Sequence, residues 1–521
     1  MSTDATRIAL STPLNGIPWL GALTLVVAGA LQTLTFAPFN LWWLGPVSVF
    51  LILLVTIPAA PGQLFRAGWF TGLGLFATGA SWVYISISEY GNTSIPIAIL
   101  LTVLFVMGLA LFHALAFWFW GKLAKESAVR RLILFPAVWI LGDWLRGWLL
   151  TGFPWLYLGT AHTDGPLAGL APLTGVHGVT FWVTVTGVAA YAAGWLFLRQ
   201  RWAMAGLVLA LTFVPWIAAP AMNRVDWTGI SEQPITFAAM QGNIPQQVKW
   251  DPDFLRDQIV TYLTLTENHW DTDLILWPET AIPITQDQAG KIIEHIDGKL
   301  GENSTLITGI PWYGFSDRIE DFTYHNSIMA IGNGGGMYHK QKLVPFGEYV
   351  PLQGLLRGLI GFFDLPMSSF SPGPGRQGPL KVNGIDVMPF ICYEVAYPDF
   401  VAFNSRAAGL LLTISNDGWF GDSIGPLQHL QIARMRALET GRYMLRGTNN
   451  GVTAIINEKG QITGRIPQFE RATLTGQVFT ATGSTPYMRT GSWPVLTLAA
   501  ILIVFVRERV IPKARDEDGA G

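Results

Sequence analysis

The stretch DVMPFICYE at residues 386–394 joins a short apolar run to the only cysteine of the chain, Cys392. Its Val, Phe and Ile residues favour extended backbone, so the stretch predicts a strand over Asp386–Ile391 that ends at the thiol. A single cysteine excludes a disulfide within the chain and a cysteine-ligated metal cluster. A lone cysteine is most often a small buried side chain. A thiol at a strand end beside Glu394 also stands where a base could activate it as a nucleophile, so both interpretations stay open.

Strand-like runs of the same kind occur on both sides of Cys392, at Ile235–Met240, Leu274–Trp277, Thr305–Ile310, Ser327–Ile331, Leu410–Ser415 and Val452–Ile456. Helical periodicity appears in residues 253–268, 286–299 and 426–440. The turn sequences Asn333–Gly336, Asn383-Gly384 and Lys459-Gly460 predict β-hairpins. Short strands mixed with helices favour a layered α/β sandwich over a β-barrel.

Charged residues are distributed unevenly along the 521 residues. They make up 13% of the chain, about half the roughly 25% of a soluble domain. Residues 228–490 contain 44 of the 68 charged side chains, or 17% of that block, whereas the other 258 positions reach only 9%. The sequence therefore predicts membrane segments around a block of nearly soluble composition. A net charge of −2 gives no electrostatic footprint for nucleic acid.

Eight apolar segments are predicted to cross a membrane, since a span needs about 20 mostly apolar residues. They are residues 17–35, 41–58, 65–84, 95–120, 132–150, 169–198, 203–220 and 492–506. The predicted organisation is a seven-helix transmembrane region at 1–227, a domain outside the membrane at 228–490, and an eighth helix with a basic tail at 491–521. The first segment is interpreted as an uncleaved membrane anchor rather than a signal peptide.

Basic residues orient these spans by the positive-inside rule. If the spans alternate in direction, twelve of the fourteen basic residues outside the block fall on one side of the membrane. Only Arg146 and Arg224 fall on the other side. This distribution predicts cytoplasmic termini and an extracytoplasmic block.

Two further segments of the block contain candidate catalytic residues. Glu279 follows the predicted strand in LWPET, where desolvation would make a carboxylate a better base, although an ordinary helix N-terminal acid is an alternative. Lys340 and Lys342 precede Glu348 in YHKQKLVPFGE, where a fixed ammonium could stabilise a thiolate or an oxyanion, or simply be solvated at a strand end.

Common catalytic and metal-binding motifs do not occur in the sequence. It has no G-x-S-x-G, H-E-x-x-H, Walker or C-x-x-C pattern. His325, His339 and His429 lack metal-ligand spacing, so each is predicted to be a hydrogen-bonded structural histidine. The predicted site therefore contains no metal.

The order of the Glu279, Lys340 and Cys392 segments resembles the Glu–Lys–Cys site of the nitrilase superfamily. With seven spans before the block and one after it, the chain resembles the apolipoprotein N-acyltransferase family of the Gram-negative inner membrane. The matching stretches are Gln241–Gln246, Val344–Pro351 and Ser415–Phe420. The resemblance implies a bundle of eight transmembrane helices and a nitrilase-like αββα sandwich.

The resemblance also implies roles for individual residues. Glu279 would be the proton carrier, Cys392 the nucleophile, and Lys340 the group that stabilises the oxyanion together with the backbone N–H of Tyr393. Glu348 would orient Lys340, which is preferred over Lys342 because it holds the family's place eight residues before Glu348. The remaining residues implied for the site or for substrate binding are Tyr393, Glu394, Trp250, Asn326 and Trp419.

The implied reaction is a two-step acyl transfer without a cofactor. A fatty acyl group from the sn-1 position of phosphatidylethanolamine would form a thioester on the enzyme. The α-amino group of the diacylglyceryl-cysteine of an apolipoprotein would then accept the acyl group, as the last step of bacterial lipoprotein maturation. The implied setting is a monomer in the inner membrane, with the catalytic domain in the periplasm.

The segment Leu352–Phe363, LQGLLRGLIGFF, is an apolar run too short to span a membrane. It is either an ordinary buried helix or, as we hypothesise, an arm at the membrane interface that gates lipid access through residues such as Leu355 and Phe362. The aromatic loop around Trp148, Trp155 and Tyr157 is expected to lie on the same side of the membrane.

Two other classes of protein fit parts of the sequence. A membrane-tethered amidase of the nitrilase type would share the site but use water as the acceptor. A transporter with an appended binding domain would need charged residues deep in the spans. The nearest candidates, Glu89, Asp143 and Arg146, all fall near predicted span ends, which argues against a transporter.

Overall fold

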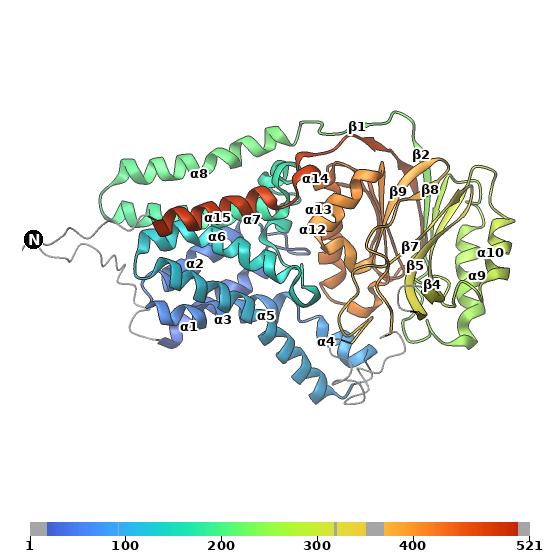
Figure 1. Cartoon of the computed structure of the whole chain (residues 1–521), viewed down its shortest axis with the longest axis horizontal. Coiled ribbons are helices and arrows are strands. Elements are labelled where there is room, and N and C mark those ends of the chain that lie inside the picture. Colours follow the sequence, from blue (N-terminus) through green and yellow to red (C-terminus); the bar gives the residue numbers. More distant parts are fainter. Residues whose placement is uncertain (1–17, 92, 317–319, 351–368, 509–521) are drawn as a thin grey trace, which may run out of the picture.

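The computed structural model describes residues 18–91, 93–316, 320–350 and 369–508 (Figure 1). A helical part and a part built from β-sheets lie side by side along the longest axis of the molecule. All described strands fall between Gly229 and Thr482. This division matches the change in charge content along the sequence.

Each predicted span coincides with a helix. These helices are α1 (Pro18–Thr33), α2 (Leu44–Thr56), α3 (Leu64–Gly79), α5 (Ile95–Ala124), α6 (Ala128–Arg146), α7 (Ala171–Leu198), α8 (Trp202–Met222) and α15 (Trp493–Glu508). Long apolar runs with few charged residues explain why the sequence located them.

Not every one of these helices has the dimensions of a membrane span. Among the described residues, α5, α7 and α8 are long and apolar enough to cross a membrane. Helices α1, α2 and α15 are apolar but shorter, and α6 contains four charged residues. The prediction of eight crossings is therefore supported only in part.

The predicted span at 65–84 is wrong in its boundary. Helix α3 ends at Gly79, and the chain bends by 63° before the short helical segments α4 (Val83–Ile85) and η4 (Ser86–Tyr90). The two pieces together are either a broken span or a re-entrant segment. The bend brings Trp82 and Ser86 against the sheet domain.

The described strands form two large sheets and a two-stranded ribbon. The ribbon pairs β1 (Gly229–Ile230) with β15 (Ala481–Thr482). One sheet has the order β13 (Ile462–Ile466), β12 (Thr453–Ile456), β11 (Met444–Thr448), β10 (Leu410–Ser415), β9 (Ile385–Ile391), β8 (Leu380–Val382), β6 (Gly334–Gly335). The other has the order β14 (Ala472–Val478), β2 (Ile235–Gln241), β3 (Leu274–Leu276), β4 (Thr305–Ser316), β5 (Asp321–Gly332), β7 (Met337–His339).

The centre of each sheet is parallel and its margins are antiparallel. Strands β9, β10 and β11 run parallel, as do β2, β3 and β4. Parallel strands end at the same edge of a sheet, and functional groups of α/β proteins gather at their carboxyl ends. The central strands β3 and β9 therefore end just before the predicted site residues Glu279 and Cys392.

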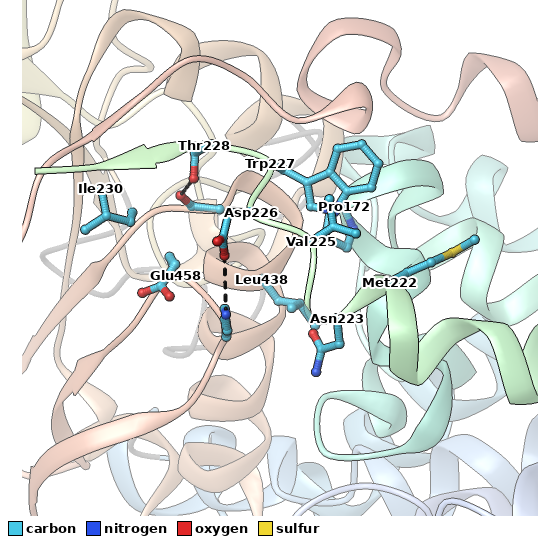
Figure 2. Close-up of a pocket in the computed structure, with 12 residues that line it drawn as sticks. Pro172, Met222, Asn223, Val225, Asp226, Trp227, Thr228, Ile230, Leu438 and Glu458 are labelled. Atoms are coloured by element: carbon cyan, nitrogen blue, oxygen red, sulfur yellow. Dashed lines mark hydrogen bonds and ion pairs between the residues drawn. The ribbon is translucent and has the colours of Figure 1, made fainter.

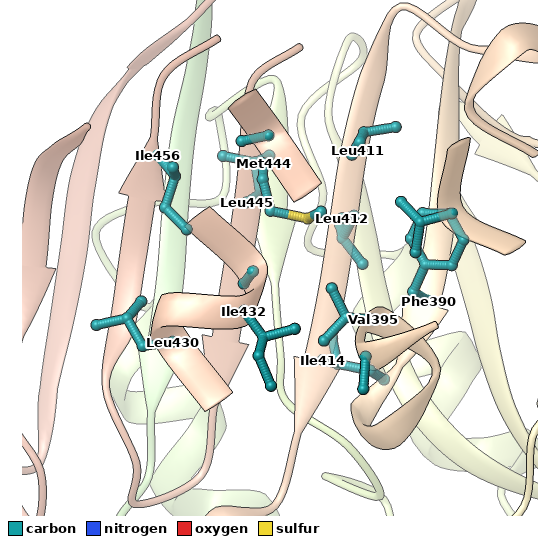
Figure 3. Close-up of a cluster of buried hydrophobic side chains, with 14 of the residues drawn as sticks. Phe390, Val395, Leu411, Leu412, Ile414, Leu430, Ile432, Met444, Leu445 and Ile456 are labelled. Carbon is teal, nitrogen blue, oxygen red and sulfur yellow. The ribbon is translucent and has the colours of Figure 1, made fainter. Parts of the chain in front are cut away.

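Helices cover the outer face of each sheet. Helices α9 (Leu255–Thr266) and α10 (Gly290–Asp297) pack on the six-stranded sheet, and α12 (Pro398–Asn404) and α13 (Gly425–Thr440) lie between the seven-stranded sheet and the helical part (Figure 1). Leu430 and Ile432 of α13 belong to the same buried cluster as Leu445 and Ile414 of the strands (Figure 3). The predicted αββα sandwich is confirmed for the described residues.

The predicted strands, helices and hairpins of the block are largely confirmed. The Gly-rich turn does join β5 to β7, but Gly334 and Gly335 also pair with β8 of the other sheet, which the sequence did not indicate. Strands β13 and β14 were missed because they alternate between intermediate and exposed residues and contain polar side chains. Strand β11 was missed because buried Arg446 interrupts its apolar run.

Candidate active site

Three strand ends bring an acid, an ammonium and a thiol together. Glu279 follows β3, Lys340 follows β7, and Cys392 follows β9 of the other sheet. The Lys340 Nζ lies 3.6 Å from Glu279 Oε1 and 2.8 Å from Glu348 Oε1. All three charged side chains are buried, with Lys340 only 1% exposed. Residues 113 positions apart in the sequence thus form one compact group.

Asn326 of β5 connects the two carboxylates of this group. Its Nδ2 donates hydrogen bonds to Glu279 Oε1 (2.7 Å) and to Glu348 Oε1 (2.8 Å). The other Glu348 oxygen accepts from the backbone N–H of Val344 (2.8 Å). Asn326 therefore fixes the position of Glu279, and Glu348, held by Asn326 and the Val344 backbone, fixes that of Lys340.

The turn that presents Glu279 is tightly constrained. Its Oε2 accepts from the backbone N–H of Asn416 (2.8 Å). The next residue, Thr280, has a φ of +49°, in the left-handed region. A Cβ at Gly309 of the adjacent strand would lie 2.3 Å from the Thr280 nitrogen, so only glycine leaves room for this turn. No helix begins here, which excludes the interpretation of Glu279 as a helix N-terminal acid.

Cys392 also occupies a strained position. It directly follows β9 and has a φ of +51°, which costs of order 1–3 kcal/mol for a residue other than glycine. Its carbonyl oxygen accepts a hydrogen bond from Nε2 of His429 (3.1 Å). Such a conformation persists only where surrounding contacts fix it, so the thiol is held at the strand end rather than resting there by chance.

The charge states of the thiol and of Lys340 follow from burial and neighbouring charges. Burial raises the pKa of the Cys392 thiol well above its ordinary value, Glu279 raises it further, and Lys340 acts against them. Burial alone would lower the pKa of Lys340, but Glu348, Glu279 and Cys392 together hold it above its ordinary value. At neutral pH the thiol is therefore protonated, and it becomes a nucleophile only when a neighbour takes its proton.

A second buried group supports the cysteine turn from behind. Asp417 Oδ2 accepts from Arg446 Nη2 (2.6 Å), and its Oδ1 lies 3.1 Å from His429 Nδ1. The prediction that His429 is a hydrogen-bonded structural histidine is confirmed. Its contact with the Cys392 carbonyl was missed, because His429 follows Cys392 by 37 positions and only the packing of α13 brings them together.

Glu394 fastens the cysteine turn to the segment after β7. One of its oxygens accepts from the backbone N–H groups of Gln341 (2.6 Å) and Lys342 (3.1 Å), and the other accepts from that of Ile391 (2.8 Å). The hydroxyl of Tyr338 also donates to it (3.0 Å). Burial raises the pKa of Glu394 to about 7, while the backbone donors lower it. Glu394 thus positions both segments without touching the thiol.

Of the two neighbouring lysines, only Lys340 joins the acidic group. The Lys342 Nζ instead lies over the rings of Tyr397 and Phe400, at 5.5 and 5.7 Å. Strand β7 ends at His339 and the chain bends at Gln341 and Lys342, so the two side chains lie in different surroundings.

The loop after α6 contacts the residue that follows the thiol. The Tyr393 hydroxyl donates to the Gly152 carbonyl (2.9 Å), and its ring stacks on Trp155 at 6.4 Å. Arg146 holds this loop by donating to the carbonyls of Phe153 and Trp155, both at 2.6 Å. Arg146, predicted near a span end, therefore anchors the loop that reaches the site.

The bent segment after α3 makes a second contact with the sheet domain. The indoles of Trp82 and Trp155 both donate to Gln428 Oε1 of α13, at 3.3 and 2.8 Å. The Ser86 hydroxyl donates to the Trp419 carbonyl (2.7 Å). The bent segment after α3 and the loop after α6 thus both contact the sheet domain, at α13 and at Trp419.

Comparison with known proteins identifies the family of this chain. Residues 28–189 match the model of the apolipoprotein N-acyltransferase N-terminal domain, and residues 236–487 match that of carbon-nitrogen hydrolases. The apolipoprotein N-acyltransferase of Pseudomonas syringae pv. tomato is 47% identical over 93% of this chain and 96% of its own length. That of Coxiella burnetii is 40% identical over 94% of this chain and 99% of its own. The chain belongs to the apolipoprotein N-acyltransferase family.

As a member of the apolipoprotein N-acyltransferase family, the protein is an acyltransferase with a nitrilase-like domain. A similar relative from Azotobacter vinelandii is 46% identical over 93% of this chain and 94% of its own length. Among solved structures, that of the C. elegans NitFhit protein matches 53% of this chain and 65% of its own, with 13% identity and a TM-score of 0.36.

The remaining residues that family resemblance implied lie in different surroundings. Trp419 is partly buried and packs against Tyr90 at 5.7 Å. Trp250 is partly buried, and its indole Nε1 has no hydrogen-bond partner among the described residues. Leu355 and Phe362 lie outside the described residues, as does the whole predicted arm at 352–363. The described residues therefore bring together the predicted polar group and the contacts of Tyr393 and Trp419, whereas the predicted arm lies outside them.

The predicted aromatic loop divides into three environments. Trp155 is buried against Tyr393, whereas the Tyr157 ring faces Arg146 at 4.8 Å. Trp148 is 50% exposed. Trp155 is therefore the member of this loop that stacks on the segment that carries the thiol.

The predicted site residues lie apart from a surface pocket at the start of the sheet domain. No group of three His, Cys, Asp or Glu side chains that could hold a metal ion occurs in the described part of the chain. A surface pocket at the start of the sheet domain is lined by residues such as Trp227 and by the Asp226–Lys459 ion pair of 3.5 Å (Figure 2). None of the predicted site residues lines it.

Proposed function

We propose that this acyltransferase moves a fatty acyl group from phospholipid to the N-terminal amine of apolipoproteins through a thioester on Cys392. The donor is the sn-1 ester of phosphatidylethanolamine, and the acceptor is the α-amino group of diacylglyceryl-cysteine. One observation supports the proposal most directly. The buried group of Glu279, Lys340 and Cys392 lies beside Tyr393, which contacts the loop that Arg146 of α6 holds, so the site adjoins the helical part of the chain.

In the first half-reaction, Glu279 takes the proton of the Cys392 thiol, and the sulfur attacks the ester carbonyl. The Lys340 ammonium and the backbone N–H of Tyr393 stabilise the oxyanion. The intermediate collapses to a thioester, and the leaving lysophospholipid oxygen takes the proton back from Glu279. The raised pKa of the buried thiol explains why a base must act at the same moment.

In the second half-reaction, the neutral amine of the lipopeptide attacks the thioester carbonyl. Glu279 accepts the proton of the attacking nitrogen and returns it to the departing sulfur. Glu348, Asn326 and Glu394 keep Lys340 and Cys392 in register. Trp250 and Trp419 are the proposed contacts of the substrates, together with Leu355 and Phe362 of the proposed arm.

We propose that the chain spans the bacterial inner membrane eight times, with residues 228–490 in the periplasm and both termini in the cytoplasm. Residues 1–227 and 491–521 would then form the membrane-embedded part of a monomer. The twelve-to-two distribution of basic residues supports this orientation. A phospholipid ester already contains the activated acyl group, so the reaction requires neither ATP nor a cofactor.

A transfer assay tests the proposal against hydrolysis. Purified enzyme in detergent is mixed with phosphatidylethanolamine labelled in its sn-1 chain and with a synthetic diacylglyceryl-cysteine peptide. The expected result is labelled triacylated peptide and lysophospholipid in equal amounts. Release of labelled free fatty acid at the same rate with and without peptide would instead identify a membrane-tethered amidase or esterase.

Replacing Lys340 with methionine is expected to slow acylation of Cys392 by about 10²–10³-fold, because the oxyanion loses its cation. Loss of the cation also leaves two buried carboxylates unpaired, so the free energy of unfolding should fall by roughly 3–5 kcal/mol. Lys342→Met is the matched control. Its ammonium lies over the rings of Tyr397 and Phe400, so its loss should cost about 0.5–1 kcal/mol and leave acylation within a few-fold of the wild-type rate.

A further inference from the structure

A second buried lysine lies beside the proposed catalytic group. Lys249 is 3% exposed, and its Nζ donates a hydrogen bond of 2.8 Å to the main-chain carbonyl of Glu279. It belongs to the segment after β2, outside the three segments that suggested the site. A charged side chain is rarely buried this completely unless it is paired.

The Lys249 turn is itself built into the site. Gln258 of α9 donates to the carbonyls of Val248 (3.0 Å) and Lys249 (3.2 Å). Gln246, in the same turn, accepts from Asn416 Nδ2 (2.5 Å), and the backbone N–H of Asn416 in turn donates to Glu279. The turn therefore contacts Glu279 both directly and through Asn416.

The charges around the site explain why a second cation belongs there. Lys340 lies closer to Glu348 (2.8 Å) than to Glu279 (3.6 Å), so Glu279 shares this cation with a second carboxylate. The titratable groups that act on Lys249 are Glu279 and Cys392. Lys340, Glu348 and Asp417 are the other charged groups around those two.

We propose that Lys249 is a positioning residue of this site, which holds the main chain of Glu279 and balances its negative charge. The inference rests on the proposed function. When the S–H bond of Cys392 breaks and an O–H bond forms on Glu279, negative charge moves from oxygen to sulfur. Lys249 interacts electrostatically with both Glu279 and Cys392. The same cation therefore stabilises the negative charge before and after the proton moves.

The pH dependence of acylation distinguishes this role from a structural one. Burial lowers the pKa of Lys249 to about 8, with Glu279 and Cys392 opposing the shift, whereas the pKa values of Lys340 and the Cys392 thiol are raised. The wild-type rate of Cys392 acylation should therefore fall about fivefold between pH 7 and pH 9 as the Lys249 ammonium loses its proton, because the neutral form keeps the slower rate expected of the uncharged variants. The rate is measured by mass spectrometry of quenched enzyme mixed with phosphatidylethanolamine.

The Lys249→Gln side chain can still donate a hydrogen bond to the Glu279 carbonyl but has no charge. The Lys249→Met side chain has neither the donor nor the charge. Both variants are expected to acylate about tenfold more slowly at pH 7 and to show no further fall up to pH 9. Gln258→Met loosens the same turn and retains the ammonium, so it should keep the alkaline fall. Glu394, whose pKa is about 7, is present in the wild type and in every variant. Its contribution to the pH dependence is therefore the same in all of them.

Three results would overturn the inference: a wild-type rate that does not fall above pH 8, an alkaline fall that persists in Lys249→Gln, or a fall that Gln258→Met also abolishes. The wild-type profile alone decides the first of these, even if a Lys249 variant fails to fold. A wild-type enzyme that forms no acyl-Cys392 at any pH would contradict the proposed function instead.

Discussion

Replacing Cys392 with serine should eliminate the hydroxylamine-sensitive fatty acyl adduct from the purified protein and lower acyl transfer by roughly 10⁴-fold or more. The thioester can form only on this residue, because the chain contains no other cysteine. Burial already raises the pKa of the thiol, and a serine hydroxyl in the same place would be far harder to ionise. Mass spectrometry of wild-type and variant protein, before and after hydroxylamine, provides the measurement.

The serine variant is also expected to fold normally. Serine and cysteine have nearly the same shape, and the hydrogen bond from His429 reaches the main-chain carbonyl rather than the sulfur. The melting temperature should therefore change by only a few degrees. Wild-type protein without any adduct after incubation with phospholipid, or a serine variant with undiminished transfer, would refute the thioester mechanism.

Replacing Glu279 with glutamine should slow acylation of Cys392 by about 10²–10⁴-fold, which is the usual contribution of a general base. The amide cannot accept the thiol proton. Lys340 still pairs with Glu348 at 2.8 Å, so the oxyanion-stabilising cation stays in place. The measurement is the single-turnover rate of acyl-enzyme formation, followed by mass spectrometry.

Glutamine also changes the local hydrogen bonding. Both oxygens of Glu279 accept bonds, from Asn326 and from the Asn416 backbone, and the amide nitrogen of glutamine can replace only one oxygen by a donor. The lost bond should cost about 1–3 kcal/mol of unfolding free energy. Glu267→Gln, at an exposed position just after α9, is the control and should acylate at the wild-type rate. Equal rates for Glu279→Gln and this control would remove Glu279 from the mechanism.

Local pattern was sufficient to locate most elements of the fold. Apolar runs predicted the helices of the helical part, and β-branched runs predicted the central strands. Each of these patterns can be recognised within about a dozen residues. The bend at Gly79 escaped detection because the hydropathy of residues 65–84 is continuous across it. Strands β13 and β14 escaped because polar residues occupy their exposed positions.

The candidate site was recognised through three short motifs, whereas its supporting residues were not. In the sequence, Lys249 is a lysine before a tryptophan with no motif around it, and Arg446 interrupts an apolar run. Both are buried and bonded to site residues in the fold: Lys249 to the Glu279 carbonyl and Arg446 to Asp417. A single sequence gives no periodic signal for such contacts, because they depend on which strands become neighbours.

The sequence by itself determined that this chain combines apolar helices with an α/β domain, and that Glu279, Lys340 and Cys392 each stand at a strand end. Only the tertiary structure decided that these ends, drawn from two different sheets, meet around Asn326. It alone also decided that the loop held by Arg146 contacts Tyr393 beside the thiol. The physical reason is that periodicity and propensity act over a few residues, whereas the meeting of distant segments is set by sheet order and by the packing of buried side chains.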